Sequence, residues 1–274
     1  MHYYRTVYWT MNIVKELQSP VILTNVFNMA TDPLMFAQDD LESGGKPWIV
    51  NDFSYNNNVM QAAVNIRMGF LRKVYGLLSL QLLMTVIVSG TFMFIPAIRS
   101  YVQTNDWLLQ FAFLLSIIVL IVLYIKRKDS PANLILLAAF TVIQAYFVGV
   151  IITFCDVVIV FQALILTVTV FLGLTAYTFQ SKRDFSSLGS GLFAALCCLL
   201  VGSLLSCFIA SSAMELVLSW AGAVIFCLYI IYDTQMLMQK LSPEEYIFAT
   251  VSLYLDLINL FIEILKILET FRKH

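Results

Sequence analysis

The sequence predicts an all-α membrane protein, a bundle of seven transmembrane helices. Of its 274 residues, 60% are hydrophobic and only 12% are charged, and the mean hydropathy is +0.85. Soluble domains are far more polar, with about 25% charged residues. The hydrophobic residues also gather in blocks of about 20, the length that a helix needs to cross a bilayer at a rise of about 1.5 Å per residue.

Seven such blocks follow one another from residue 74 onwards, and only short loops separate them. These loops leave no room for a separate soluble domain between the blocks. In chain order, the blocks cover residues 74–95, 107–125, 132–154, 157–179, 188–210, 214–238 and 246–268.

Residues 1–65 differ in character from the rest of the chain. Short apolar runs alternate there with acidic, glycine-containing and asparagine-rich stretches. None of these runs is long and apolar enough for a signal peptide or a span. We therefore expect residues 1–65 to form a mobile cytosolic extension and residues 66–274 to form the seven-helix transmembrane domain.

Basic residues flank the blocks in a pattern that predicts the orientation. They stand before the first block and after the second, fourth and sixth, which places all of them on one side if every block spans. Because Lys and Arg stay on the cytoplasmic side, the N-terminus is predicted to be cytosolic. The basic groups are Arg67, Arg72 and Lys73; Lys126, Arg127 and Lys128; Lys182 and Arg183; and Lys240.

Arg272 and Lys273 follow the seventh block and do not fit this pattern, because they would lie on the opposite side. Two arrangements are open. Either the charge at this end of the chain is tolerated, or the last block is re-entrant and returns to the side from which it entered. Re-entrant backbone is allowed where protein or a water-filled cavity surrounds it. We favour seven full spans.

The composition excludes several classes of function. The formal net charge is −1, so the chain lacks the concentrated basic surface that binds nucleic acid. His2 and His274 stand at the two ends of the chain, where they build neither a zinc site nor a catalytic triad. Four of the five cysteines fall inside apolar blocks, where thiols act as small hydrophobic groups. We expect neither an enzyme nor a bound cofactor.

Two aspartates, Asp233 and Asp256, lie inside the last two blocks. A charged Asp at the bilayer centre costs about 2.5–3.5 kcal/mol, so each needs a partner, a proton or water. Asp233 lies about 10 Å before Lys240, and Asp256 lies about 16 Å beyond Glu245. A short turn joins the two blocks, so their helices should be antiparallel neighbours. We therefore expect the two carboxyl groups to meet.

A stripe of polar residues runs along the last block. Its members are spaced by four, three and four residues, so they share one helix face that should look into the bundle. In the sixth block, Glu215 lies about five turns before Asp233 and shares its face. Acids at both ends of one inward face suggest an ion path, whereas an acid at a helix start can equally be an interfacial cap. The stripe consists of Ser252, Asp256, Asn259 and Glu263.

Two carboxyl groups that meet in a low-dielectric interior cannot both be ionised at low cost, so they share a proton and titrate as a unit. Loss of that proton leaves two negative charges that repel each other and attract a hard cation. Ca²⁺, which takes oxygen ligands, is the natural physiological choice. Asp233 and Asp256 are therefore candidates for a pH-dependent gate or a Ca²⁺ site. The alternative is a proton-sharing link between two helices that has no role in transport.

Several motifs resemble the transmembrane Bax inhibitor motif family, and two of them resemble its Golgi anti-apoptotic branch more narrowly. The resemblance covers residues 50–274 and leaves out the first 40 or so residues. Three motifs lie in the last two blocks: IIYDTQ (230–235), KLSPEEY (240–246) and SLYLDLINLFIEIL (252–265). The two narrower motifs are IRMGFLRKVYGLLSLQ (66–81) and LTAYTFQSKRDFS (174–186).

The resemblance implies a seven-helix bundle of the Golgi and the endoplasmic reticulum that leaks Ca²⁺ from stores in a pH-dependent way and suppresses apoptosis. It implies that Asp233 and Asp256 form the pH-sensing centre. It also implies a basic latch on one of the acids near the end of the second block, where YIKRKD offers Lys126 and Arg127. Its partners would be the lipid bilayer, Ca²⁺ and apoptosis-regulating membrane proteins.

Three other functions are open at this stage. An intramembrane aspartyl protease also has two aspartates on its sixth and seventh helices, but it needs a Gly-x-Gly-Asp approach. Here Leu253, Tyr254 and Leu255 precede Asp256 and would block backbone access for a substrate. A regulatory scaffold would act through partner binding, with a merely structural acid pair. A Ca²⁺/H⁺ exchanger would differ from a leak channel only in coupling the two fluxes.

Overall fold

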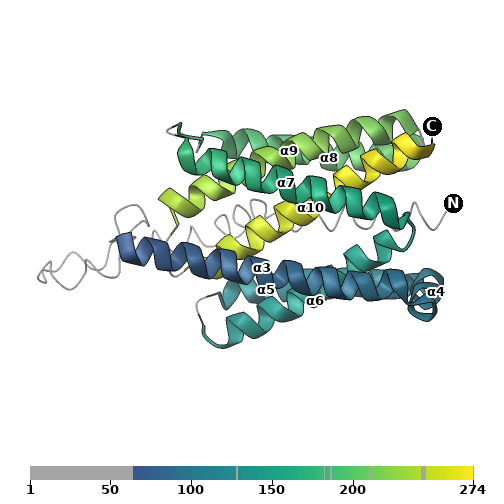
Figure 1. Ribbon diagram of the computed structural model, residues 1–274, viewed down its shortest axis with the longest axis horizontal. Helices are drawn as coiled ribbons and strands as arrows, with labels where there is room; N and C mark the ends of the chain where they lie inside the picture. The colour runs from purple at the N-terminus through teal and green to yellow at the C-terminus, as the bar shows by residue number, and fades with distance from the viewer. Residues whose placement is uncertain are drawn as a thin grey trace, which may run out of the picture.

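The computed structural model describes residues 64–127, 129–181, 183–185, 187–209, 212–241 and 245–273. All regular structure within these ranges is helical (Figure 1). The helices are α3 (Val64–Phe94), α4 (Pro96–Thr104), α5 (Asp106–Ile125), α6 (Ala132–Ile152), α7 (Val157–Gln180), α8 (Leu188–Ile209), α9 (Ser212–Gln239) and α10 (Tyr246–Lys273). The predicted extension falls almost wholly in residues 1–63, outside the described part of the chain.

The prediction of seven spans is confirmed. Seven of these helices, all except α4, are long and apolar enough to cross a membrane. The predicted boundaries hold within a few residues, except that α3 begins ten residues before the expected start at residue 74. Arg72 and Lys73 therefore lie inside the helix, because basic side chains mark the membrane edge and do not end a helix. The short α4 was not expected; Pro96 stands at its first turn, where a missing N–H costs nothing.

The last block is one unbroken helix, so the re-entrant alternative is wrong. The 28 residues of α10 extend about 42 Å, more than a bilayer's hydrocarbon core needs. At its far end, Arg272 Nη1 lies 2.6 Å from Asp156 Oδ2, which sits directly before α7. The positive charge that broke the predicted pattern therefore has an acidic partner.

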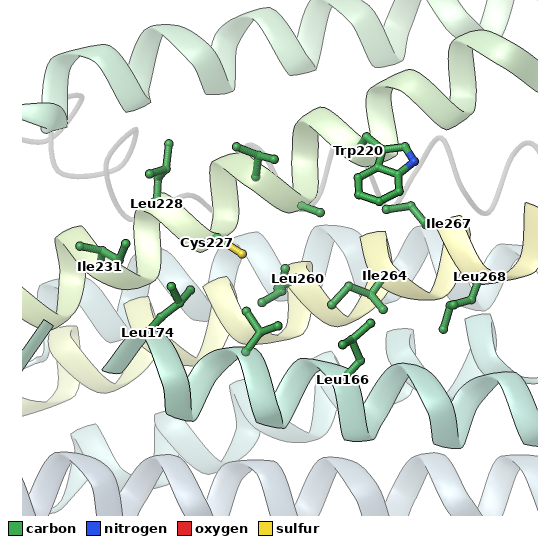
Figure 2. Close-up of a pocket in the computed structure, with 13 residues that line it drawn as sticks. Leu166, Leu174, Trp220, Cys227, Leu228, Ile231, Leu260, Ile264, Ile267 and Leu268 are labelled. Atoms are coloured by element: carbon green, nitrogen blue, oxygen red, sulfur yellow. The ribbon is translucent and has the colours of Figure 1, made fainter. Parts of the chain in front are cut away.

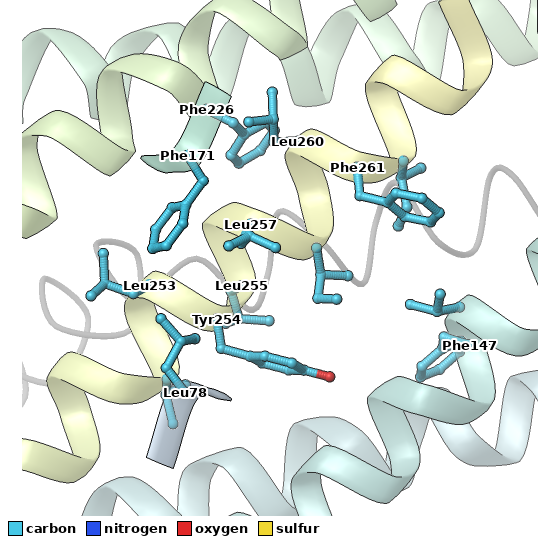
Figure 3. Packing of buried hydrophobic residues seen from close by; sticks show 14 of the residues in the cluster. Leu78, Phe147, Phe171, Phe226, Leu253, Tyr254, Leu255, Leu257, Leu260 and Phe261 are labelled. Atoms are coloured by element: carbon cyan, nitrogen blue, oxygen red, sulfur yellow. The ribbon is translucent and has the colours of Figure 1, made fainter. Parts of the chain in front are cut away.

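α10 is the central helix of the bundle. In Figure 1 it crosses between α7, α8 and α9 on one side and α3, α5 and α6 on the other, and it packs against α9, α7, α3 and α6. Of the residues in the most apolar stretch of α10, 94% are buried, compared with 17% of those in the corresponding stretch of α8. Figure 3 shows its leucines between Phe171 and Phe226 on one side and Leu78 and Phe147 on the other. The side chains in the middle of α10 are therefore surrounded by protein.

Candidate functional site

Asp233 of α9 and Asp256 of α10 meet inside the bundle. Their carboxyl groups are hydrogen-bonded to each other. Asp256 is 3% exposed, and Asp233 is half-buried. Asp233 lies about 9 Å from the end of α9, and Asp256 lies about 15 Å from the start of α10. α9 and α10 pack along each other, so the depths deduced from the sequence do bring the two groups together. Residues 242–244 of the connecting turn lie outside the described ranges.

The pair has unused acceptor capacity. The Oδ2 atoms of Asp233 and Asp256 are both buried and have no hydrogen-bond partner among the described residues. Buried oxygens of this kind are usually satisfied by a proton, water or an ion. Within the described ranges no group of three or more His, Cys, Asp or Glu side chains stands close enough to hold a metal. A cation at the pair would therefore complete its oxygen shell with water or neutral oxygens.

The predicted stripe on α10 is buried. Ser252, Asn259 and Glu263 are exposed by 3%, 6% and 4%, in line with Asp256. Together they form a continuous polar strip along the central helix. Glu215 does not join them, because it lies exposed in the first turn of α9. Its position fits an acid at a helix start, as in the interfacial interpretation.

The two candidate latch residues have partners other than the acid pair. Arg127 Nη2 lies 3.4 Å from Glu245 Oε1, at the beginning of α10, and its guanidinium stacks over the Tyr124 ring. Lys126 pairs with Asp129 at 3.9 Å, on the surface. In this structure Arg127 therefore ties the end of α5 to α10 and contacts neither Asp233 nor Asp256.

Comparison with known proteins identifies the family. The model of the family described as "Inhibitor of apoptosis-promoting Bax1" matches residues 67–273. The chain belongs to this Bax inhibitor family. Over 225 residues it is 49% identical to Protein lifeguard 4 of Mus musculus, covering 82% of this chain and 94% of that protein. The Golgi anti-apoptotic protein of vaccinia virus (strain Lister) is 47% identical over 225 residues, with 82% and 95% covered.

A more distant relative extends the match. Bax inhibitor 1 of Schizosaccharomyces pombe is 39% identical over 245 residues, which covers 89% of this chain and 92% of that protein. The family is not one of enzymes, in agreement with the sequence prediction, and the aspartyl protease alternative is excluded. This Bax inhibitor family member is a multi-pass membrane protein.

Gln235 has a role beside the acid pair that sequence reasoning missed. It lies two residues after Asp233 in the IIYDTQ motif and holds the segment between α7 and α8. Its Oε1 accepts a hydrogen bond from the Phe185 N–H at 2.6 Å, and its Nε2 donates to the Arg183 carbonyl at 3.1 Å. One half of the motif thus supplies the acid, and the other half fixes the loop beside it.

Polar side chains also link α10 to the opposite half of the bundle. The Tyr254 hydroxyl lies 2.8 Å from Thr85 Oγ1 of α3, and the contact is buried. Asn133 Nδ2 of α6 donates to the Tyr246 hydroxyl at 2.9 Å. Lys73 Nζ lies 3.3 Å from the centre of the Tyr246 ring. These links run between distant segments, so spacing along the chain could not reveal them.

An apolar cavity of about 390 Å³ lies between α7, α9 and α10 (Figure 2). Figure 2 shows Trp220, Cys227 and Leu260 among the side chains that line it. None of its lining residues is charged, and none offers a carboxylate or amide oxygen. Such a lining cannot replace the hydration shell of a hard cation. The cavity is therefore not the candidate ion site.

Proposed function

We propose that this Bax inhibitor family member is a pH-sensitive Ca²⁺ leak channel of the Golgi and the endoplasmic reticulum that lowers store Ca²⁺ and inhibits apoptosis. The single observation that carries the proposal is the hydrogen-bonded pair of Asp233 and Asp256 in the middle of the bundle. The relative named Golgi anti-apoptotic protein supports the location and the cellular role.

In this proposal the pair works as a gate. With a shared proton, Asp233 and Asp256 hold α9 and α10 together at mid-depth. Without it, two like charges in a low-dielectric interior repel each other strongly. The helices then separate locally, and the carboxylates attract Ca²⁺ from the water that enters. Flux should therefore rise as the pH is raised from acidic to neutral. The buried strip of Ser252, Asn259 and Glu263 extends the route along α10.

The proposed orientation keeps the N-terminus in the cytosol. Arg72 lies in the first third of α3, and Arg127 and Lys240 follow the ends of α5 and α9; these parts of the three helices would share the cytosolic side. The domain boundary stays as the sequence suggests, with residues 1–65 an extension and residues 66–274 the transmembrane unit. The family match begins at residue 67, which supports this division.

The test is Ca²⁺ flux into vesicles reconstituted with full-length protein, measured with an enclosed fluorescent indicator across a pH series. Asp233→Asn and Asp256→Asn should each abolish the pH dependence, because an amide cannot exchange the shared proton. Asp129→Asn is the matched control, since it removes a surface carboxylate of 67% exposure. An unchanged pH response in both pair variants would refute the gate.

The same preparation separates the two remaining alternatives. A pH indicator inside the vesicles reports whether protons move in fixed proportion to Ca²⁺, as they would in an exchanger and not in a leak channel. In cells, Asp256→Asn, which should have lost the pH response of the flux, should also lose protection against apoptosis. If it protected fully, the scaffold that acts through partner binding would replace the channel as the explanation.

A further inference from the structure

A second pair of charges lies on α10, beyond the acid pair. Lys266 Nζ lies 3.4 Å from Glu263 Oε2 and 3.5 Å from Oε1. The Glu263 side chain is 6% exposed and that of Lys266 is 16% exposed. Removing two charges from water costs several kcal/mol per ion even when they pair, and apolar side chains would be cheaper in a bilayer. An ion pair at this position therefore points to a role other than stability.

The position of Glu263 continues the route from the acid pair. It lies seven residues after Asp256, which is two turns and about 10 Å further along the same face of α10. The buried Asn259 lies between them. Two turns beyond Glu263, α10 reaches its last residues, where Arg272 binds Asp156. Glu263 is thus the next carboxylate that a cation would meet after leaving Asp256.

The neighbouring helix is shaped around the Glu263 carboxyl group. Gly222 of α9 faces it so closely that a Cβ there would lie 3.0 Å from Glu263 Cδ and Cγ and 3.2 Å from Oε1. Any larger residue would force the side chain to move. The Glu263 carboxyl group is therefore held at a fixed place against the α9 backbone.

We propose that Lys266 is a built-in blocking cation on the Ca²⁺ route, and that its ammonium group occupies a second cation station formed by Glu263. The inference rests on the proposed Ca²⁺ leak. A cation that passes Asp256 meets a carboxylate already neutralised by a tethered charge, and it must displace that charge to move on. The ammonium also repels an approaching divalent ion, and this repulsion is strong where water is scarce. Lys266 therefore limits the rate of the leak.

The test compares four variants of the full-length protein in the vesicle assay, at a pH at which the wild type is active. Lys266→Gln removes the tethered positive charge from Glu263 and should raise the Ca²⁺ flux several-fold. Glu263→Gln removes the carboxylate that pairs with the Lys266 ammonium but keeps the positive charge on the route, and it should lower the flux several-fold. The double variant removes both charges and should lie between the two. Lys266→Arg keeps the cation and should match the wild type.

The directions in which Lys266→Gln and Glu263→Gln change the Ca²⁺ flux decide whether Lys266 blocks the route. If the pair were only a structural link, both single variants would slow the flux together and the double variant would recover it, and that result would overturn the proposal. Lys266→Arg keeps the positive charge and the double variant removes both charges, so these two variants show whether the substitutions themselves disturb folding. Wild-type vesicles without flux would overturn the leak and this inference together. Normal wild-type flux with no rise in Lys266→Gln would overturn this inference alone.

Discussion

Replacement of Gly189 by alanine should destabilise the protein where α8 packs against α9, next to Asp233. Gly189 is the second residue of α8 and faces Tyr232, which directly precedes Asp233. A Cβ at Gly189 would lie 2.8 Å from Tyr232 Oη, 3.1 Å from Cζ and 3.2 Å from Cε2. Ordinary van der Waals contact begins at 3.4 Å, so the tyrosine must retreat by about 0.6 Å. A rigid ring cannot do so without moving its neighbours.

The expected loss follows from two opposing effects. Overpacking of this kind costs about 1–3 kcal/mol, while alanine is about 0.5–1 kcal/mol better than glycine in a helix. Gly191, two residues later in the same helix, has nothing within 4 Å of its Cβ position. Gly191→Ala therefore gains helix propensity without the clash. The free energies of unfolding of the two variants should differ by about 1–3 kcal/mol, the cost of the contact alone.

The assay is thermal unfolding of both purified variants in the same detergent, beside the wild type. Gly189→Ala should unfold at a lower temperature than Gly191→Ala, and Gly191→Ala should match or exceed the wild type. Because Tyr232 precedes Asp233, Gly189→Ala should also alter the pH response of the flux. Equal unfolding temperatures for the two alanine variants would refute the close approach of α8 to Tyr232.

Three further outcomes are expected. Thr85→Val should cost about 1–3 kcal/mol of stability in unfolding assays, and Tyr254→Phe about 0.5–1.5 kcal/mol. Thr85→Val leaves the buried Tyr254 hydroxyl unpaired, whereas in Tyr254→Phe the Thr85 hydroxyl keeps its bond to a backbone carbonyl. The reverse order of the two losses would contradict this hydrogen bond. The Arg272 guanidinium holds the pKa of Asp156 below its ordinary value. This pair should therefore stabilise the end of α10 above about pH 4 and lose its effect as the pH falls further. Hydrogen exchange in the last turn of α10 should become faster over that fall in pH in the wild type, and Asp156→Asn should show no such step. Deletion of residues 1–40 should leave Ca²⁺ flux intact, and loss of flux with normal membrane insertion would show that the extension takes part.

The acid pair could be predicted from the sequence because its geometry is local. Asp233 and Asp256 lie on consecutive helices joined by a short turn, and a constant rise per residue is enough to compare their depths. The partner of Arg127 could not be predicted in this way. Glu245 is 118 residues distant along the chain, and only the packing of α5 beside the start of α10 brings the two together.

The close contacts of individual glycines could not be predicted from the sequence either. Gly189 of α8 is approached closely by an α9 side chain and Gly222 of α9 by an α10 side chain, whereas Gly191 and Gly173 have open space around them. Nothing in the local sequence separates the first two from the last two. What separates them is the identity of the facing side chain, Tyr232 or Glu263, and that depends on how the helices are rotated about their axes.

The place of charges within a helix predicts its position in the bundle better than its overall hydropathy does. α10 has the least apolar span and is the most buried, and α5 has the most apolar span and is 22% buried. This contrast is expected when hydrocarbon surrounds the protein, because polar groups then turn inward. α3 is nearly as polar as α10, yet it is only 28% buried. Its basic residues, such as Arg72, gather at one end, where side chains reach the interface. Asp256 and Glu263 lie in the middle of α10, too far from either surface to do so, and they force that helix to the centre.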